Sequence, residues 1–227
     1  MKRAAEATTL ALTQPVKDAH RWALAGIMLT VIAIGWKYPA LGFIVPLAMV
    51  TGIAGSFSRG RYVCGNLCPR GSFYDTVFRL MGGTRRIPEL VQRPAFRWTV
   101  LAGLMGFMAL QIARKPADPL HWGYVFWLAC VLTTAVGVVF GTVYRARTWC
   151  AFCPVGTMAA TFGGGNHQLQ IAETCRSCGV CEGSCPMGFV IAEHREVGIL
   201  PHRDCLKCSA CVDSCSRSAL NWPPNNR

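Results

Sequence analysis

The chain has 227 residues, of which 52% are hydrophobic and only 15% charged, and it carries a formal net charge of +12. That length leaves room for one or two modest domains, and so low a share of charge is unusual for a soluble protein. The arginines are concentrated between long apolar runs, as in membrane proteins, so the charge does not indicate a nucleic-acid-binding protein.

Four apolar stretches predict four transmembrane helices. A helix needs about 17–25 residues to cross the bilayer, and flanking residues can complete the two shorter stretches. Tryptophans stand at the stretch ends, where their amphipathic rings prefer the membrane interface. The stretches run over residues 22–36, 40–57, 98–113 and 122–144.

Lysine and arginine predict the orientation of these helices. Positive residues crowd the segments before the first stretch (beginning with Lys2 and Arg3), between the second and third, and after the fourth. The opposite side holds Lys37, Arg114 and Lys115. Because positive loops stay in the cytoplasm, we expect a multi-pass membrane protein with both termini inside. The first stretch lacks a cleavage site and a second follows at once, which excludes a signal peptide.

The membrane region is a duplicated unit. Each half is a helical hairpin followed by R-x2-C-x2/3-C-P-x-G-S/T, which begins at Arg61 in the first half and at Arg147 in the second. Two spans per unit make parallel repeats, related by an axis along the membrane normal. This symmetry predicts that two cysteine pairs meet at the cytoplasmic face. The pairs are Cys64 with Cys68 and Cys150 with Cys153.

These four thiols, called the C-P cysteines below, allow three interpretations. They could hold a third iron–sulfur cluster, a zinc ion, or a redox-active dithiol/disulfide couple. The unequal spacing of the two pairs weakens the symmetric-cluster interpretation. Cys130, inside the fourth stretch, is expected to pack as a small hydrophobe. No histidine lies inside a stretch and no C-x2-C-H occurs, which excludes a transmembrane bis-histidine haem and a c-type haem.

Two connecting segments also carry expectations. Residues 73–81 predict an interfacial helix with Phe73, Val77, Leu80 and Met81 on one face. Three consecutive glycines at 163–165 predict a flexible joint before a polar C-terminal domain.

The strongest signal is a C-x2-C-x2-C-x3-C run repeated thirty residues later. It is the pattern of bacterial two-cluster ferredoxins, in which the fourth cysteine of each run ligates the other 4Fe–4S cluster. Proline follows the first run, but Ser216 replaces it in the second, which puts the local backbone in question. One cluster would take Cys175, Cys178, Cys181 and Cys215, and the other Cys205, Cys208, Cys211 and Cys185.

Together these motifs resemble the NapH/NosR-type family of membrane-bound 4Fe–4S ferredoxins, which includes quinol dehydrogenase membrane components and the membrane ferredoxin of methylamine utilisation. The resemblance covers about residues 20–215. It implies an electron-transfer subunit of a quinone-linked oxidoreductase complex in the bacterial inner membrane, which passes electrons between the quinone pool and a partner redox protein of a respiratory chain. A maturation reductase for metals or cofactors, or a redox-sensing regulator of the NosR/CcoG type, is the alternative.

The expected fold is a mainly α membrane protein with a small α+β domain. A cytoplasmic tail (1–19) precedes four transmembrane helices arranged as two repeated hairpins (20–162). A bacterial two-cluster ferredoxin domain follows (163–227).

Overall fold

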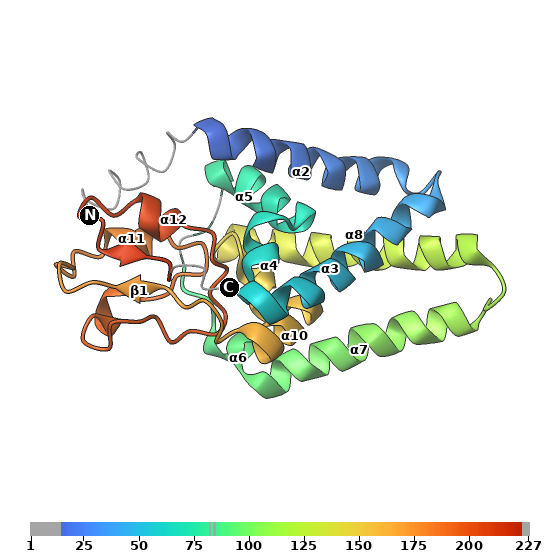
Figure 1. Cartoon of the computed structure of the whole chain (residues 1–227). Helices are drawn as coiled ribbons and strands as arrows, with labels where there is room; N and C mark the ends of the chain where they lie inside the picture. The colour runs from blue at the N-terminus through green and yellow to red at the C-terminus, as the bar shows by residue number, and fades with distance from the viewer. Residues whose placement is uncertain (1–14, 82, 84, 224–227) are drawn as a thin grey trace.

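The computed structural model describes residues 15–81, 83 and 85–223 (Figure 1). Lys2, Arg3 and most of the predicted N-terminal tail lie outside the described residues. The side chains of Leu80 and Met81, on the predicted interfacial face, lie outside them as well.

Helices form at all four apolar stretches. Among the described residues, three helical segments are long and apolar enough to cross a membrane, which suggests a membrane protein. They are η1 with α3, then α7, then α8, and α2 contributes a shorter apolar segment, Ala19–Ile34. The bounds are α2 Pro15–Ile34, η1 Pro39–Phe43, α3 Ile44–Arg59, α7 Pro94–Ala113 and α8 Pro119–Val143.

Each C-P motif folds into two consecutive helices. Helix α4 (Tyr62–Asn66) is followed by α5 (Pro69–Met81), and α9 (Thr148–Phe152) by α10 (Pro154–Gly163). The motif proline opens the longer helix in both halves, where its missing N–H costs nothing. Helix α5 packs on α2 and α8, whereas α10 packs on α3 and α7. The two halves of the duplicated unit therefore interlock. The short helix α6 (Glu89–Gln92) precedes α7.

Helix α5 is a packed helix instead of an interfacial one. Phe73, Tyr74 and Phe78 are buried, with Tyr74 at 0% exposure. Tyr74 donates a hydrogen bond of 3.3 Å to the Thr134 carbonyl in α8. The shared helical face of Phe73 and Val77 predicts a helix lying at the membrane interface, but α5 packs on α2 and α8, with Tyr74 and Phe78 against the α8 glycines Gly137 and Gly141.

The C-terminal domain is a small α+β unit. Strands β1 (Gln170–Ile171) and β2 (Leu220–Asn221) pair antiparallel, with Gln170 opposite Asn221 and Ile171 opposite Leu220. Its short helices are α11 (Val180–Gly183), η2 (Ala192–His194) and α12 (Ala210–Asp213). The domain lies at the end of the long helices where α4 and α10 are found (Figure 1).

The two cysteine runs of this domain have the same backbone. Positive φ angles recur thirty residues apart at Ser177 and Lys207, Gly179 and Ser209, and Gly188 and Ser218. The Gly188 N–H donates to the Cys185 carbonyl at 3.0 Å, and Ser218 N–H donates to the Cys215 carbonyl at 3.1 Å. Replacing proline by Ser216 therefore leaves the turn after the fourth cysteine unchanged.

Candidate metal centres

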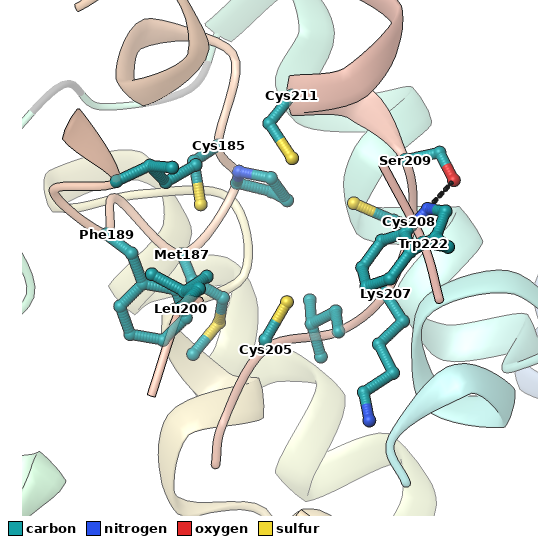
Figure 2. A pocket seen from close by; sticks show the side chains of 13 residues that line it. Cys185, Met187, Phe189, Leu200, Cys205, Lys207, Cys208, Ser209, Cys211 and Trp222 are labelled. Atoms are coloured by element: carbon teal, nitrogen blue, oxygen red, sulfur yellow. Dashed lines mark hydrogen bonds between the residues drawn. The ribbon is translucent and has the colours of Figure 1, made fainter. Parts of the chain in front are cut away.

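Four cysteines from both runs surround one small cavity of the C-terminal domain. Cys185 comes from the first run and Cys205, Cys208 and Cys211 from the second. Figure 2 shows their four sulfur atoms pointing toward a common space. This is one of the two crossed sets that the spacing predicts, here called the near set. Met187, Phe189, Leu200 and Leu206 supply apolar walls.

Burial raises the pKa of three near-set thiols, those of Cys205, Cys208 and Cys211, and so favours their neutral form in the absence of metal. Burial raises the pKa of Cys205 to about 12, and burial together with the neighbouring thiols raises the pKa of Cys211. Cationic iron would reverse this preference, because a thiolate is the ligand and metal binding displaces its proton. Four convergent thiols in an apolar wall fit a 4Fe–4S cluster.

The other crossed set, here called the distal set, lies nearer to the surface. Cys181 is buried, and Cys175 and Cys215 pack against the same apolar cluster. Burial, together with the neighbouring groups Glu182, Cys175 and Cys178, raises the pKa of Cys181 to about 11. Cys178 is exposed. The structure thus places Cys175 and Cys178 beside Cys181, and Cys215 against the apolar cluster to which Cys181 belongs.

Single-ion geometry is absent from the described part of the chain. No three His, Cys, Asp or Glu side chains among those residues are grouped to hold one metal ion. A 4Fe–4S cluster has a different requirement, since each thiolate binds a different iron atom instead of converging on one centre.

The four C-P cysteines line a single cavity of about 350 Å³. Helices α2, α3, α7 and α8 form its apolar walls, with Val31, Val45, Leu104, Met108 and Phe126 among the lining residues. All thirteen cysteines of the chain lie in the described part, and none forms a disulfide. The duplicated motifs therefore meet as the sequence symmetry predicts, between the long helices and the C-terminal domain.

Two arginines cross between the duplicated motifs. Arg61, from the first motif, donates to the Cys150 carbonyl at 2.6 Å. Arg147, from the second, donates to the Cys64 carbonyl at 3.0 Å. Both residues are only 1% exposed. Each half thus fixes the cysteine loop of the other half.

The motif glycines make room for these arginines. A Cβ at Gly71 would clash with the guanidinium of Arg147, and a Cβ at Gly156 would clash with that of Arg61. The spacing of arginine, cysteines and glycine in R-x2-C-x2/3-C-P-x-G therefore has a steric cause.

Partly buried carboxylates neutralise the crossing arginines. Asp75 accepts two hydrogen bonds of 2.7 Å from Arg147, and Arg21 lies 3.3 Å from it. Asp204, in the C-terminal domain, accepts at 2.8 Å from Arg61. Arg97 donates to the two Asp204 carboxylate oxygens at 2.7 and 2.9 Å. Bidentate arginine–carboxylate pairs of this kind are strong and directional.

One further arginine lines the cavity. Arg70 donates to the Cys130 sulfur at 3.3 Å, and its guanidinium stands 5.9 Å from the centre of the Trp149 ring. No ion pair joins Arg70 to a carboxylate of the described residues. Cys130 is buried, as expected of a packing residue, but it also contacts this cation.

The sequence interpretation missed the roles of these arginines. It used Arg21, Arg61, Arg97 and Arg147 as markers of the cytoplasmic side and of the duplicated unit, and assigned no partner to any of them. Their equivalent positions in the two halves were a usable signal, because a charge repeated at the same place in a duplicated motif indicates a structural partner.

Two family models match parts of this chain. A family model described as a 4Fe-4S binding domain matches residues 41–88 and 121–170, and one described as a 4Fe-4S dicluster domain matches residues 174–220. Two uncharacterized proteins of Methanocaldococcus jannaschii are similar to this chain. MJ0749 is 25% identical over 186 residues (78% of this chain, 70% of the relative), and MJ0750 is 24% identical over 181 residues (72% of each). No solved structure matches. The two matching models support an iron–sulfur ferredoxin family for this chain and suggest a role in electron transfer.

Proposed function

We propose that the chain is a NapH/NosR-type subunit of the bacterial inner membrane that passes electrons between the quinone pool and a partner redox protein. The near set and the distal set would each hold one 4Fe–4S cluster, and the C-P cysteines a third iron–sulfur centre. When bound, these clusters supply one-electron transfer. Both termini would lie in the cytoplasm.

The observation that carries this proposal is the contact between two cysteine loops. The Cys205–Cys208 loop of the near set packs on α4, between Cys64 and Cys68. Asn66 donates to the Lys207 carbonyl at 3.1 Å, and the Leu206 carbonyl lies so close that Gly65 has no room for a Cβ. A fold serves electron transfer by holding its redox groups close together, and this contact does so for the near set and the C-P cysteines.

An iron–sulfur centre at the C-P cysteines has two supports. The two segments that match the first 4Fe-4S binding model each contain one of the cysteine pairs. Arg61 and Arg147 also line the site or contact its loops, and their charge would offset the negative charge of thiolate-bound iron. A zinc ion at these cysteines would leave the cavity without a redox group. A dithiol/disulfide couple would supply a redox group that carries two electrons instead of one.

The cavity itself suits a quinone ring. Its walls are apolar, and few polar groups face it, which is the usual character of a small-molecule site. Arg70 could donate a hydrogen bond to a carbonyl oxygen of the ring. The exposed Cys178 marks the side on which a partner redox protein would reach the distal set.

A quinol-coupled assay tests the proposal. The full-length protein is purified anaerobically and placed in lipid nanodiscs. A short-chain quinol should then reduce its ferredoxin clusters, and the loss of their visible absorbance measures this reduction. Leu104→Trp should block this reaction without loss of iron, because Leu104 lines the cavity. Leu110→Trp on the same helix is the matched control, since Leu110 is 71% exposed. Iron-loaded wild type that never exchanges electrons with any quinone would refute the proposal.

A further inference from the structure

We infer that Asp204 is a positioning residue that docks the C-terminal domain on the C-P cysteines by supplying a carboxylate that the second half of the membrane region lacks. The docking itself follows from contacts in the structure. Its consequence for electron transfer rests on the proposed function.

The first half contains its own carboxylate for the crossing arginine. Asp75 stands seven residues after Cys68 in α5, one helical turn beyond Gly71. It pairs with Arg147 from the other half and with Arg21 at the start of the first apolar stretch. One acid thereby joins two arginines.

The second half has no acid at the equivalent position. Seven residues after Cys153 stands Ala160, which is 5% exposed in α10. Without another partner, Arg61 and Arg97, the counterparts of Arg147 and Arg21, would be buried cations. Burying unpaired charge is expensive, so a carboxylate from elsewhere is required.

Asp204 supplies that carboxylate. Its oxygens lie 2.8 Å from Arg61 Nη1 and 2.7 Å from Arg97 Nη1. The Arg61 side chain is 1% exposed and that of Arg97 10%, whereas Asp204 is 25% exposed, so the two cations are buried and their shared carboxylate is only partly so. The pattern of two arginines on one acid is thus repeated, with the acid donated by a different domain.

The same contact controls the position of the near set. Asp204 directly precedes Cys205, whose loop packs on α4. Arg145, two residues after α8, donates to the Cys185 carbonyl at 2.9 Å and so fixes the fourth cysteine of the set. In the proposed function one electron crosses from the near set to the C-P cysteines, or back, and no atom is transferred. The gap that Asp204 holds closed then sets the rate.

The test uses full-length, cluster-loaded protein in nanodiscs with three variants. Asp204→Asn removes the docking charge. The double variant Asp204→Asn/Ala160→Asp returns a carboxylate to Arg61 and Arg97 from within α10, on the same helix as Gly156 and Thr157, which these arginines already approach. Glu196→Gln is the control, because Glu196 is exposed and lies outside the docking contacts.

We expect Asp204→Asn to raise hydrogen–deuterium exchange of residues 62–66 and 204–208 by at least about tenfold while the iron content stays the same. Quinone-linked reduction of the clusters should slow by a similar factor, whereas direct reduction by dithionite should not change. The double variant should recover the melting temperature of the wild type but neither the exchange protection nor the quinone-linked rate. If Asp204→Asn does not fold, the exchange protection and the quinone-linked rate of the double variant test the inference on their own.

Two results would overturn the inference. One is wild-type exchange protection at residues 62–66 in Asp204→Asn. The other is full recovery of protection and rate in the double variant, which would reduce Asp204 to a simple counter-charge. Failure of the proposed function looks different: the wild type would show no quinone-linked rate, and the exchange data would still report on docking.

Discussion

Arg147 and Asp75 form a bidentate ion pair, in which Nε and Nη2 each lie 2.7 Å from a different carboxylate oxygen. The side chain of Arg147 is 1% exposed and that of Asp75 is 14% exposed. Since Asp75 belongs to the first half and Arg147 to the second, the pair fastens the two repeats at the C-P cysteines.

Removing this carboxylate should be strongly destabilising. We expect Asp75→Asn to cost about 3–5 kcal/mol of unfolding free energy, because it leaves a buried guanidinium without its charge partner. Thermal unfolding of the solubilised protein measures the loss. Glu196→Gln, at an exposed position, should stay within about 0.5 kcal/mol of wild type. An Asp75→Asn protein as stable as this control would contradict the assignment.

The motif glycines give a steric prediction. Alanine normally stabilises a helix relative to glycine by about 1 kcal/mol, but at Gly71 and Gly156 the added methyl group meets a buried guanidinium, so overpacking of about 1–3 kcal/mol should prevail. Gly71→Ala and Gly156→Ala should therefore lower the melting temperature. Gly103→Ala is the matched control, because nothing lies within 4 Å of its added Cβ, and it should be neutral or stabilising. Equal effects at all three positions would exclude the steric explanation.

The long helices and the grouping of the cysteines in the C-terminal domain could be predicted from the sequence, because each depends on residues that are close together in the chain. Hydrophobicity located the helices, and the repeated runs identified which cysteines gather in the C-terminal domain. The symmetry of the motifs also placed the four C-P cysteines together, which the cavity at Cys64 and Cys150 bears out.

Long-range contacts could not be predicted in this way. Gly163 was expected in a flexible joint, but it packs so closely on the Ser56 carbonyl that a Cβ would clash, and Arg203 lies against Gly164. Asp204 is a single acid with no repeat partner, so nothing in its surroundings marks it as the acid that docks a domain. Its partners Arg61 and Arg97 are 143 and 107 residues away.

Crossed ligation predicts which cysteine substitutions behave alike. The loaded protein should contain about eight iron atoms in the ferredoxin domain, and Cys185→Ala should remove about four of them. Its paramagnetic spectrum should match that of Cys208→Ala, from the other run, instead of that of Cys175→Ala, from its own run. Cys130→Ala should keep all the iron. A Cys185→Ala spectrum like that of Cys175→Ala would show uncrossed clusters, and zinc with little iron would exclude clusters altogether.

The membrane orientation is testable with reporters. The turns that carry Lys37, Arg114 and Lys115 lie at the end of the long helices opposite to the C-terminal domain (Figure 1). The excess of arginine on the domain side predicts that this side is cytoplasmic. A reporter active only in the cytoplasm should work when fused after Arg227, and one active only outside should work when inserted after Lys115. The reverse pattern would place every cysteine cluster on the other face.

The C-P cysteines give the most direct test of a third redox centre. Cys68 and Cys153 are the suitable pair to replace, because Arg147 lies 3.9 Å from the Cys150 sulfur and that side-chain contact remains. Cys68→Ala/Cys153→Ala should retain the about eight iron atoms of the ferredoxin domain, lose any iron above that number, and abolish quinone-linked transfer. A structural zinc would give a different result: lower folding stability, loss of zinc and an unchanged iron count. A double variant that keeps both its full iron content and its quinone-linked rate would show that electrons do not pass through these thiols.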